Sequence, residues 1–140
     1  MAGVNRFPFP KPGEVHNYCY LFKADADRGA IEGDKARPVL VVAAGEGKVV
    51  VMAITTKGEF SISATVRIPE AVARAMGLPR PDESWLLVSE INVFTWVGYD
   101  LRLVPGRETS LFGRSTPGFV AGAIERFRAT RSGGHVERDG

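Results

Sequence analysis

The sequence predicts a mainly β fold with short helices, a small barrel of about five to seven strands with a C-terminal α-helix packed on it. Two observations lead to this class. Short runs rich in β-branched and aromatic residues fill most of the chain, and one later stretch carries apolar residues at helical spacing. A length of 140 residues fits one domain with its own core.

The predicted strands occupy the middle of the chain. Residues 14–22 (EVHNYCYLF) alternate in the manner of a half-buried strand. The apolar runs 38–44 and 48–56 are joined by Gly-Glu-Gly, a three-residue connection typical of a β-hairpin. Further strands are expected at 63–69, 84–91 and 92–98.

Two helices are expected. The first covers 69–77, where Pro69 suits a helix start and Gly77 a helix end. The second follows Ser115 or Thr116, either of which can cap it, with Pro117 in its first turn. The apolar residues of this second helix fall on one face: Phe119, Val120, Ala123, Ile124 and Phe127.

The two ends of the chain differ in composition from the middle. Residues 1–12 contain three prolines and are expected to form a flexible N-terminal segment. Residues 130–140 are polar and glycine-rich, which predicts a disordered tail. The folded domain is therefore expected over residues 13–129.

Composition excludes several classes of protein. No apolar run approaches the roughly 18 residues of a membrane span, and no signal-peptide pattern opens the chain. The single Cys19 excludes an internal disulfide and fits a reducing, cytoplasmic location. A net charge of +2 is too small to indicate a polyanion partner by itself, so such a site requires local placement of Arg and Lys.

No cofactor or metal is expected. The dinucleotide, phosphate-loop and serine-elbow motifs are absent from the sequence. His16 and His135 lie at opposite ends of the chain, so zinc-ligand spacing is absent too. A metal site made of carboxylates alone stays possible but has no motif behind it.

Arg37 is the first candidate for chemistry. Its planar guanidinium suits bidentate contact with a phosphate. Pro38 favours an extended backbone at Arg37 and fits the start of a strand. The alternative is a surface ion pair with Glu32 or Asp34, which would contribute little to stability.

Thr55 and Thr56 end the second hairpin strand, next to Lys57. Their hydroxyls can donate hydrogen bonds to a phosphate, although both residues also suit an ordinary turn. Because the two hairpin strands run antiparallel, the start of the first lies beside the end of the second. Arg37 and Thr55 are therefore expected to be neighbours at one end of the sheet.

Glu90 and Asn92 interrupt an apolar strand and share one of its faces. Buried carboxylates are rare without partners, so Glu90 is expected to meet an arginine or to line a cleft. The aromatic residues nearby are expected in the core or an interface, with base stacking as the alternative if they are exposed: Trp85, Phe94 and Trp96.

The predicted strands and helices, taken in their order along the chain, resemble those of the MazF/PemK toxins of bacterial type II toxin–antitoxin systems. The matching stretches are GEV, RPVLVV with a glutamate five residues before it, VVVMAIT, VRIP, SWLLVSEIN and the helix ending IERF. Together they span residues 13–128. The stretch GYDLRLVPG (98–106) is similar to the PemK-like branch.

The resemblance implies an SH3-like barrel that forms a homodimer and cleaves single-stranded RNA at selected sequences without a metal. In such enzymes the 2′-hydroxyl of the RNA attacks the adjacent phosphate and leaves a 2′,3′-cyclic phosphate. The conserved arginine of the family falls on Arg37, its strand-end threonine on Thr55 and its loop acid on Glu32, which would orient Arg37 or act as a base. The residues expected to contact substrate are Thr56, Lys57, Glu90 and Asn92. A cognate antitoxin would cover the RNA groove.

This chain departs from the family pattern in two places. The loop reads RGAIEGDK where many members have Gly-His-Glu or Gly-Ser-Glu, and Glu90 stands where many have glutamine. Two other functions therefore stay open. One is a non-enzymatic toxin that poisons DNA gyrase, as CcdB-like relatives do, and the other is a binding module without toxicity.

Overall fold

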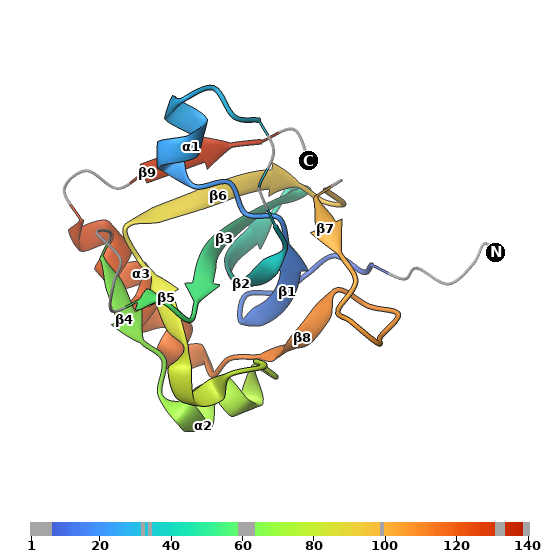
Figure 1. The fold of residues 1–140 in the computed structure, drawn as a ribbon, viewed down its shortest axis with the longest axis vertical. Coiled ribbons are helices and arrows are strands. Elements are labelled where there is room, and N and C mark those ends of the chain that lie inside the picture. Colours follow the sequence, from blue (N-terminus) through green and yellow to red (C-terminus); the bar gives the residue numbers. More distant parts are fainter. Residues whose placement is uncertain are drawn as a thin grey trace.

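The computed structural model describes residues 7–31, 33, 35–58, 64–98, 100–130 and 134–138 (Figure 1). Nine strands and three α-helices follow one another with a short 3₁₀ turn, η2. The elements in chain order are β1 Glu14–Tyr18, α1 Lys23–Asp27, β2 Arg37–Gly45, β3 Lys48–Thr55, β4 Thr65–Arg67, α2 Glu70–Ala75, η2 Pro81–Glu83, β5 Trp85–Leu87, β6 Glu90–Thr95, β7 Leu101–Arg102, β8 Leu111–Arg114, α3 Pro117–Ala129 and β9 Gly134–Glu137.

The strands pair in the order β4-β5-β3-β2-β1-β7, with β6 added to β3, β9 to β6 and β8 to β1. All pairs are antiparallel except β6–β9, which is parallel. The mainly β class and the long helix near the carboxyl end are confirmed. Among the described residues the pairings do not return to their starting strand, so the sheet is an open one and not a closed barrel.

Strand β3 pairs with two different strands along its length, β6 and β5. The break between these two strands comes earlier in the chain than the boundary predicted between strands 84–91 and 92–98. Residues 48–51 pair with β6, whereas Ile54 and Thr55 pair with β5. The chain therefore turns between Leu87 and Glu90. Consequently Trp85 and Glu90 lie on different strands, β5 and β6.

The β2–β3 hairpin is tighter than the predicted Gly-Glu-Gly connection. Gly45 pairs with Lys48, which leaves two residues in the turn. These are Glu46 and Gly47, with φ of 54° and 80°. Positive φ at both positions matches a type I′ turn, whose twist suits the flanking strands.

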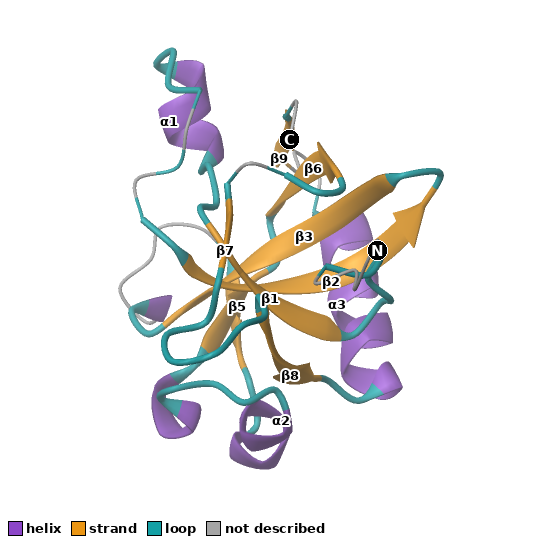
Figure 2. Cartoon of the chain, turned by 90° about the vertical axis from the view of Figure 1, so that its right-hand side faces the viewer, coloured by secondary structure: helices purple, strands orange, loops and turns teal. Residues whose placement is uncertain are grey.

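The sheet buries a different apolar cluster on each face. One cluster packs against α2 and α3 and includes Leu40, Met52 and Leu86. The other is rich in aromatic residues and consists of Tyr18, Tyr20, Val39, Val41, Val49, Val51, Ala53, Leu87 and Phe94. Neighbouring residues of β2 and β3 alternate between the clusters, as the two-residue period of a strand requires. In Figure 2, α1 and α2 lie at opposite ends of the molecule, and α3 runs beside β2.

The helix signals in the sequence act as expected. Thr116 caps α3, because its side chain accepts a hydrogen bond of 3.3 Å from the backbone N–H of Phe119. Pro117 occupies the first turn of α3. Gly77 follows α2 with a φ of 73°, a conformation that side chains rarely adopt. No helix in the described part of the chain is long and apolar enough to cross a membrane.

The predicted disordered tail over 130–140 is wrong for residues 134–138. Gly134–Glu137 form β9 beside β6, and the backbone N–H of Arg138 donates to Val93. Strand pairing uses backbone groups that every non-proline residue carries, so polar composition does not reveal it. Part of the predicted flexible segment 1–12 also lies on the domain, since the Trp96 indole donates a 2.8 Å hydrogen bond to the Phe7 carbonyl.

Candidate functional site

Three chemically distinct side chains lie in one row across β4, β5 and β3. Arg67 is opposite Trp85, and Trp85 is opposite Thr55. Directly opposed residues of antiparallel strands project from the same face of a sheet. Thr55 comes two residues after Ala53, and Trp85 comes two residues before Leu87, both of the aromatic-rich cluster. The row therefore lies at the border of that face.

Arg37 lies at the same end of the sheet on the next strand. The β2–β3 ladder runs to the pair Val39–Ala53, and Arg37 and Thr55 are each two residues beyond it. Side chains two residues apart share a face, so Arg37 and Thr55 project from the same side. This arrangement agrees with the hairpin prediction. We call the four residues Arg67, Trp85, Thr55 and Arg37 the strand-end row.

Arg37 is half-buried at the first position of β2. Its guanidinium carbon lies 4.8 Å from the centre of the Phe22 ring, within the range of a cation–π interaction. Phe22 itself packs against the aromatic-rich cluster. The ring therefore gives Arg37 a rigid support at the rim of the sheet. Glu32 and Asp34, the alternative ion-pair partners of Arg37, lie outside the described residues.

Thr55 is oriented by its own turn. Its Oγ1 accepts a hydrogen bond of 3.1 Å from the backbone N–H of Lys57. A hydroxyl that accepts one bond still has its proton to donate, so Thr55 can give a hydrogen bond to an oxygen of a ligand. Thr56 and Lys57, predicted to contact substrate, are exposed directly after β3.

Trp85 and Arg67 complete the row on its far side. The guanidinium carbon of Arg67 lies 5.5 Å from the Trp85 ring centre. Gly58 approaches the same indole so closely that an added Cβ would lie 2.2 Å from its Cγ. The sequence prediction missed Arg67. The alternation of SATVRIP contained the signal, because it sets Arg67 at the end of a strand.

Glu90 does not belong to the strand-end row. It is buried at the start of β6, where Oε1 accepts hydrogen bonds from the Tyr20 hydroxyl at 3.2 Å and the Lys23 backbone N–H at 3.1 Å. Burial raises the pKa of the Glu90 carboxyl above its usual value, and these hydrogen bonds oppose the rise. Its partners are a tyrosine and an amide instead of the expected arginine. The role in substrate binding predicted for Glu90 has no support from this position.

Asn92 is 0% exposed, and its side-chain amide binds the backbone of Leu21, which follows β1. Its Oδ1 accepts from the Leu21 N–H at 2.9 Å, and its Nδ2 donates to the Leu21 carbonyl at 2.7 Å. The amide thus replaces a missing strand neighbour for Leu21. Both of its polar atoms are used within the protein and the side chain is buried, so substrate binding by Asn92 stays a prediction that this position does not support.

A buried ion pair joins the C-terminal strand to the rest of the domain. The guanidinium of Arg138 donates to the Asp100 carboxylate, to the Tyr18 hydroxyl at 2.7 Å and to the Cys19 carbonyl at 2.8 Å. The side chains of Arg138 and Asp100 are 3% and 6% exposed. We call this the Arg138 network. Nothing in the polar tail sequence signalled it.

The cysteine beside this network is not an activated thiol. Cys19 is buried, and burial raises the pKa of its thiol. Arg102, Arg138 and Arg37 favour the thiolate by their charge, but burial has the larger effect. A thiol kept protonated is a poor nucleophile, so Cys19 belongs to the fold.

A second buried polar cluster has the order of a serine–histidine–acid relay. Ser110 Oγ lies 2.8 Å from His16 Nδ1, and His16 Nε2 lies 2.8 Å from Glu14 Oε1. Burial lowers the pKa of His16, and the neighbouring Glu14 opposes this effect. Ser110 is 1% exposed, so a substrate cannot reach its hydroxyl. The cluster therefore ties β1 to the segment before β8.

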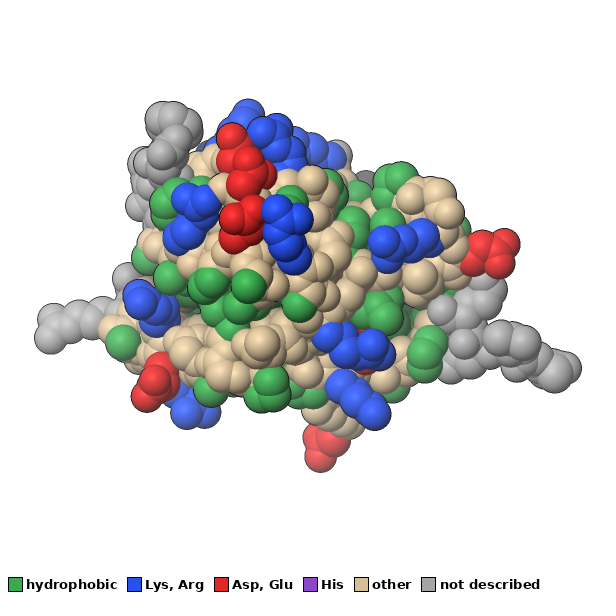
Figure 3. Space-filling model, turned by 90° about the horizontal axis from the view of Figure 1, so that it is seen from below, with side chains coloured by type: hydrophobic (Ala, Val, Ile, Leu, Met, Phe, Trp, Pro, Cys, Tyr) green, Lys and Arg blue, Asp and Glu red, His purple; other side chains and the backbone are tan. Residues whose placement is uncertain are grey.

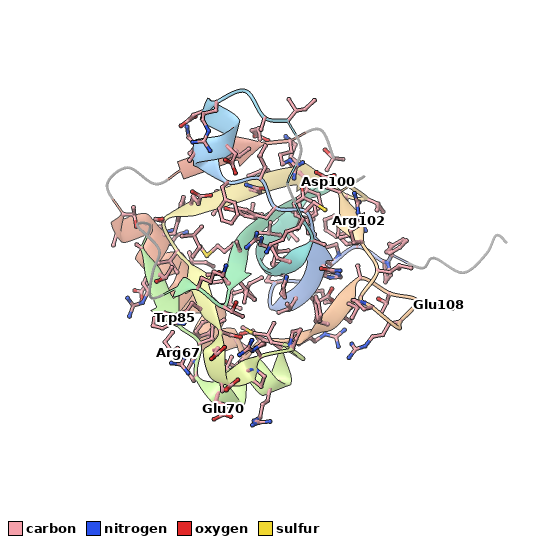
Figure 4. All side chains as sticks on the ribbon, in the orientation of Figure 1. Arg67, Glu70, Trp85, Asp100, Arg102 and Glu108 are labelled. Carbon is pink, nitrogen blue, oxygen red and sulfur yellow. The ribbon has the colours of Figure 1, made fainter. Side chains whose placement is uncertain are left out.

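Charged side chains are found on several sides of the molecule. Figure 4 shows Arg67 and Trp85 together at the β4–β5 end, with Asp100 and Arg102 on the opposite side of the molecule. Figure 3, which views the molecule from below relative to Figure 1, shows Lys and Arg side chains spread over that face, several of them beside Asp or Glu. Within the part of the chain that the structure describes, no three His, Cys, Asp or Glu side chains form a group able to hold a metal ion.

No protein-family model matches the chain, and no curated protein matches its sequence significantly.

Proposed function

We propose that this protein is a metal-independent, sequence-selective endoribonuclease that cleaves single-stranded RNA and acts as the growth-inhibiting toxin of a toxin–antitoxin system. One observation carries the proposal: Arg37 and Thr55 project from the same face at the ends of two adjacent strands. A guanidinium beside a hydroxyl donor matches the needs of a phosphodiester, which presents negative charge and hydrogen-bond acceptors. The resemblance to MazF/PemK toxins assigns these same two positions to catalysis.

In the proposed reaction the ribose 2′-oxygen attacks the adjacent phosphorus. A new O2′–P bond forms and the P–O5′ bond breaks, and O5′ takes a proton from solvent water, which leaves a 2′,3′-cyclic phosphate and a 5′-hydroxyl. Negative charge grows on the non-bridging oxygens in the transition state. Arg37 neutralises this charge, and the Thr55 hydroxyl donates a hydrogen bond to one of those oxygens.

The proton of the 2′-hydroxyl needs an acceptor other than Arg37. A guanidinium has a pKa above about 12 and stays protonated throughout. We assign the acceptor role to Glu32, which aligns with the loop acid of the family and lies outside the described residues. Thr56 and Lys57, exposed beside Thr55, are assigned to the RNA backbone.

The resemblance also supplies the proposed partners. The protein acts in the cytoplasm as a homodimer and is inhibited by a cognate antitoxin. Light scattering at micromolar concentration tests the dimer directly, and a monomeric mass would contradict it.

The decisive experiment maps the ends of a long, sequence-diverse RNA incubated with purified protein in excess EDTA. Wild-type protein is compared with Arg37→Ala and with Arg74→Ala, a control on α2 that removes an exposed arginine paired with Glu70. We expect discrete cuts with 2′,3′-cyclic phosphate ends from the wild type and from Arg74→Ala. We expect Arg37→Ala to be at least about 100-fold slower, as for the loss of one transition-state donor.

Other outcomes would redirect the assignment. Equal cleavage by Arg37→Ala would remove that residue from the active site. Intact RNA together with gyrase-dependent growth arrest would favour the CcdB-like alternative. Intact RNA with a harmless protein would favour a binding module.

A further inference from the structure

Arg67 is an exposed cation that the proposed reaction does not use. It ends β4, and its guanidinium carbon lies 5.5 Å from the centre of the Trp85 ring. The same guanidinium donates a hydrogen bond to the backbone carbonyl of Asp82. These two contacts hold a long side chain in one place, so less conformational entropy is lost when a ligand binds.

The charge of Arg67 is not neutralised by its neighbours. Glu70 pairs with Arg74 at 2.7 Å on α2, and Glu83 pairs with Arg80 beside η2. Among the described residues no carboxylate forms an ion pair with Arg67. The guanidinium has five N–H donors, and most of them remain for an incoming anion.

Trp85 is held in place by its strand partners and by Gly58. It pairs with Thr55 on one side and with Arg67 on the other. Gly58 packs against the indole, and its carbonyl accepts a 3.1 Å hydrogen bond from the Thr65 hydroxyl. A rigid indole makes the position of Arg67 reproducible, as a binding site requires.

Arg67 lies two strands away from Thr55 on the same face. Neighbouring strands are spaced about 4.8 Å apart, so the two backbones are separated by about 10 Å. A single nucleic acid strand held by its scissile phosphate at Arg37 and Thr55 can bring a neighbouring phosphate to Arg67. The row thus runs across the ends of four strands, from the proposed cleavage site on β2 and β3 to β5 and β4.

From these contacts we infer that Arg67, supported by Trp85, is a second phosphate-binding subsite, which takes a phosphate of the RNA backbone close to the one that is cleaved. The inference rests on the proposed function, since it extends the binding track of the same site. It assigns Arg67 to binding and not to the chemical step.

The first test measures binding of a labelled single-stranded RNA whose cut site carries a 2′-deoxy nucleotide and therefore cannot be cleaved. Affinity is measured by fluorescence polarisation over a series of salt concentrations for wild type, Arg67→Gln, Arg67→Lys and Arg74→Gln. We expect Arg67→Gln to reduce the slope of log affinity against log salt by about 0.7, the value for one lost phosphate contact on a single strand. Arg67→Lys should restore most of that slope, and Arg74→Gln should match the wild type.

The second test locates the phosphate. Single neutral methylphosphonate linkages replace the phosphates of the RNA one at a time. At one linkage near the cut, wild-type affinity should fall while Arg67→Gln loses nothing further. In cleavage assays on unmodified RNA, Arg67→Gln should raise KM and leave kcat close to that of the wild type, because the residue binds ground state and transition state alike.

The possible outcomes distinguish a failure of the Arg67 subsite from a failure of the proposed nuclease function. If the wild type binds and cleaves RNA and Arg67→Gln behaves in the same way at every salt concentration, the subsite is wrong and the nuclease stands. If the loss appears equally at all methylphosphonate positions, Arg67 acts through the general field and the subsite is again wrong. If the wild type neither binds nor cleaves RNA, both proposals fail. Thermal melting checks that every variant is folded.

Discussion

The strand-end row and the Arg138 network both contain arginine and aromatic side chains, but they satisfy their charges differently. The Arg138 side chain is 3% exposed, and its donors meet a carboxylate, a hydroxyl and a backbone carbonyl. Arg67 is exposed and rests on an indole and one carbonyl. A buried arginine needs its partners to offset its desolvation, whereas a supported surface arginine keeps donors for a ligand. The comparison therefore favours a role in stability for the network, whereas the row is the site proposed for binding.

The largest effect is expected from Asp100→Ala in the Arg138 network. Removing the carboxylate leaves the Arg138 guanidinium buried without its counter-charge, which costs about 3–5 kcal/mol of the free energy of unfolding. Urea denaturation measures the loss, and the double variant Asp100→Ala/Arg138→Ala should recover part of it. A loss below about 1 kcal/mol would show that the network is no more important than an exposed ion pair.

A smaller loss is expected from Asn92→Ala. The Leu21 N–H and carbonyl then lose their partners inside the protein, at about 2–4 kcal/mol for the two groups together. Because Asn92 is buried away from the row, the cleavage rate per folded molecule should stay at the wild-type value. A variant of unchanged stability with impaired RNA cleavage would reverse our reading of Asn92 as a fold residue.

Thr55→Val in the strand-end row is expected to slow RNA cleavage and to leave the stability of the protein nearly unchanged. Valine keeps the shape of threonine and removes the hydroxyl proposed to donate to the phosphate. We expect cleavage to slow about 100-fold, which corresponds to about 2.7 kcal/mol of transition-state stabilisation. The free energy of unfolding should change by less than about 1 kcal/mol. Thr95→Val, at an exposed position of β6, is the matched control.

The smallest effect concerns the pH dependence of stability at Glu90. Burial raises the pKa of this carboxyl above the usual 4.5, so the folded state favours the protonated form. Ionisation of Glu90 at higher pH therefore lowers the free energy of unfolding, and this loss disappears once the carboxyl is protonated at lower pH. Relative to Glu90→Gln, the wild type should lose stability as the pH rises from about 4 to 7. A difference independent of pH in urea titrations would contradict the raised pKa.

The predictions that rest on short local sequence patterns are confirmed by the structure. The hairpin, the start of α3 after Thr116 and the end of α2 at Gly77 all follow from turn and cap chemistry within a few residues. The placement of Arg37 beside the end of β3 follows in the same way, because hairpin register depends on a short turn. Patterns of this kind carry their cause in adjacent residues.

Contacts with partners distant in the sequence could not be predicted from local patterns. Asn92 and Glu90 were expected at a substrate, yet their partners come from residues 20–23, about 70 positions earlier. The alternation placed both residues on one face correctly but gave no information about what covers that face.

The sequence by itself determined the mainly β class, the hairpin and the end of the sheet at which Arg37 and Thr55 lie. The tertiary structure alone decided that β9 pairs with β6, that Arg138 is buried on Asp100, and that Arg67 rests on Trp85. The physical reason is the range of the interactions. Turns and caps are fixed by neighbours in the chain, whereas burial and pairing of a charge depend on residues that only folding brings together.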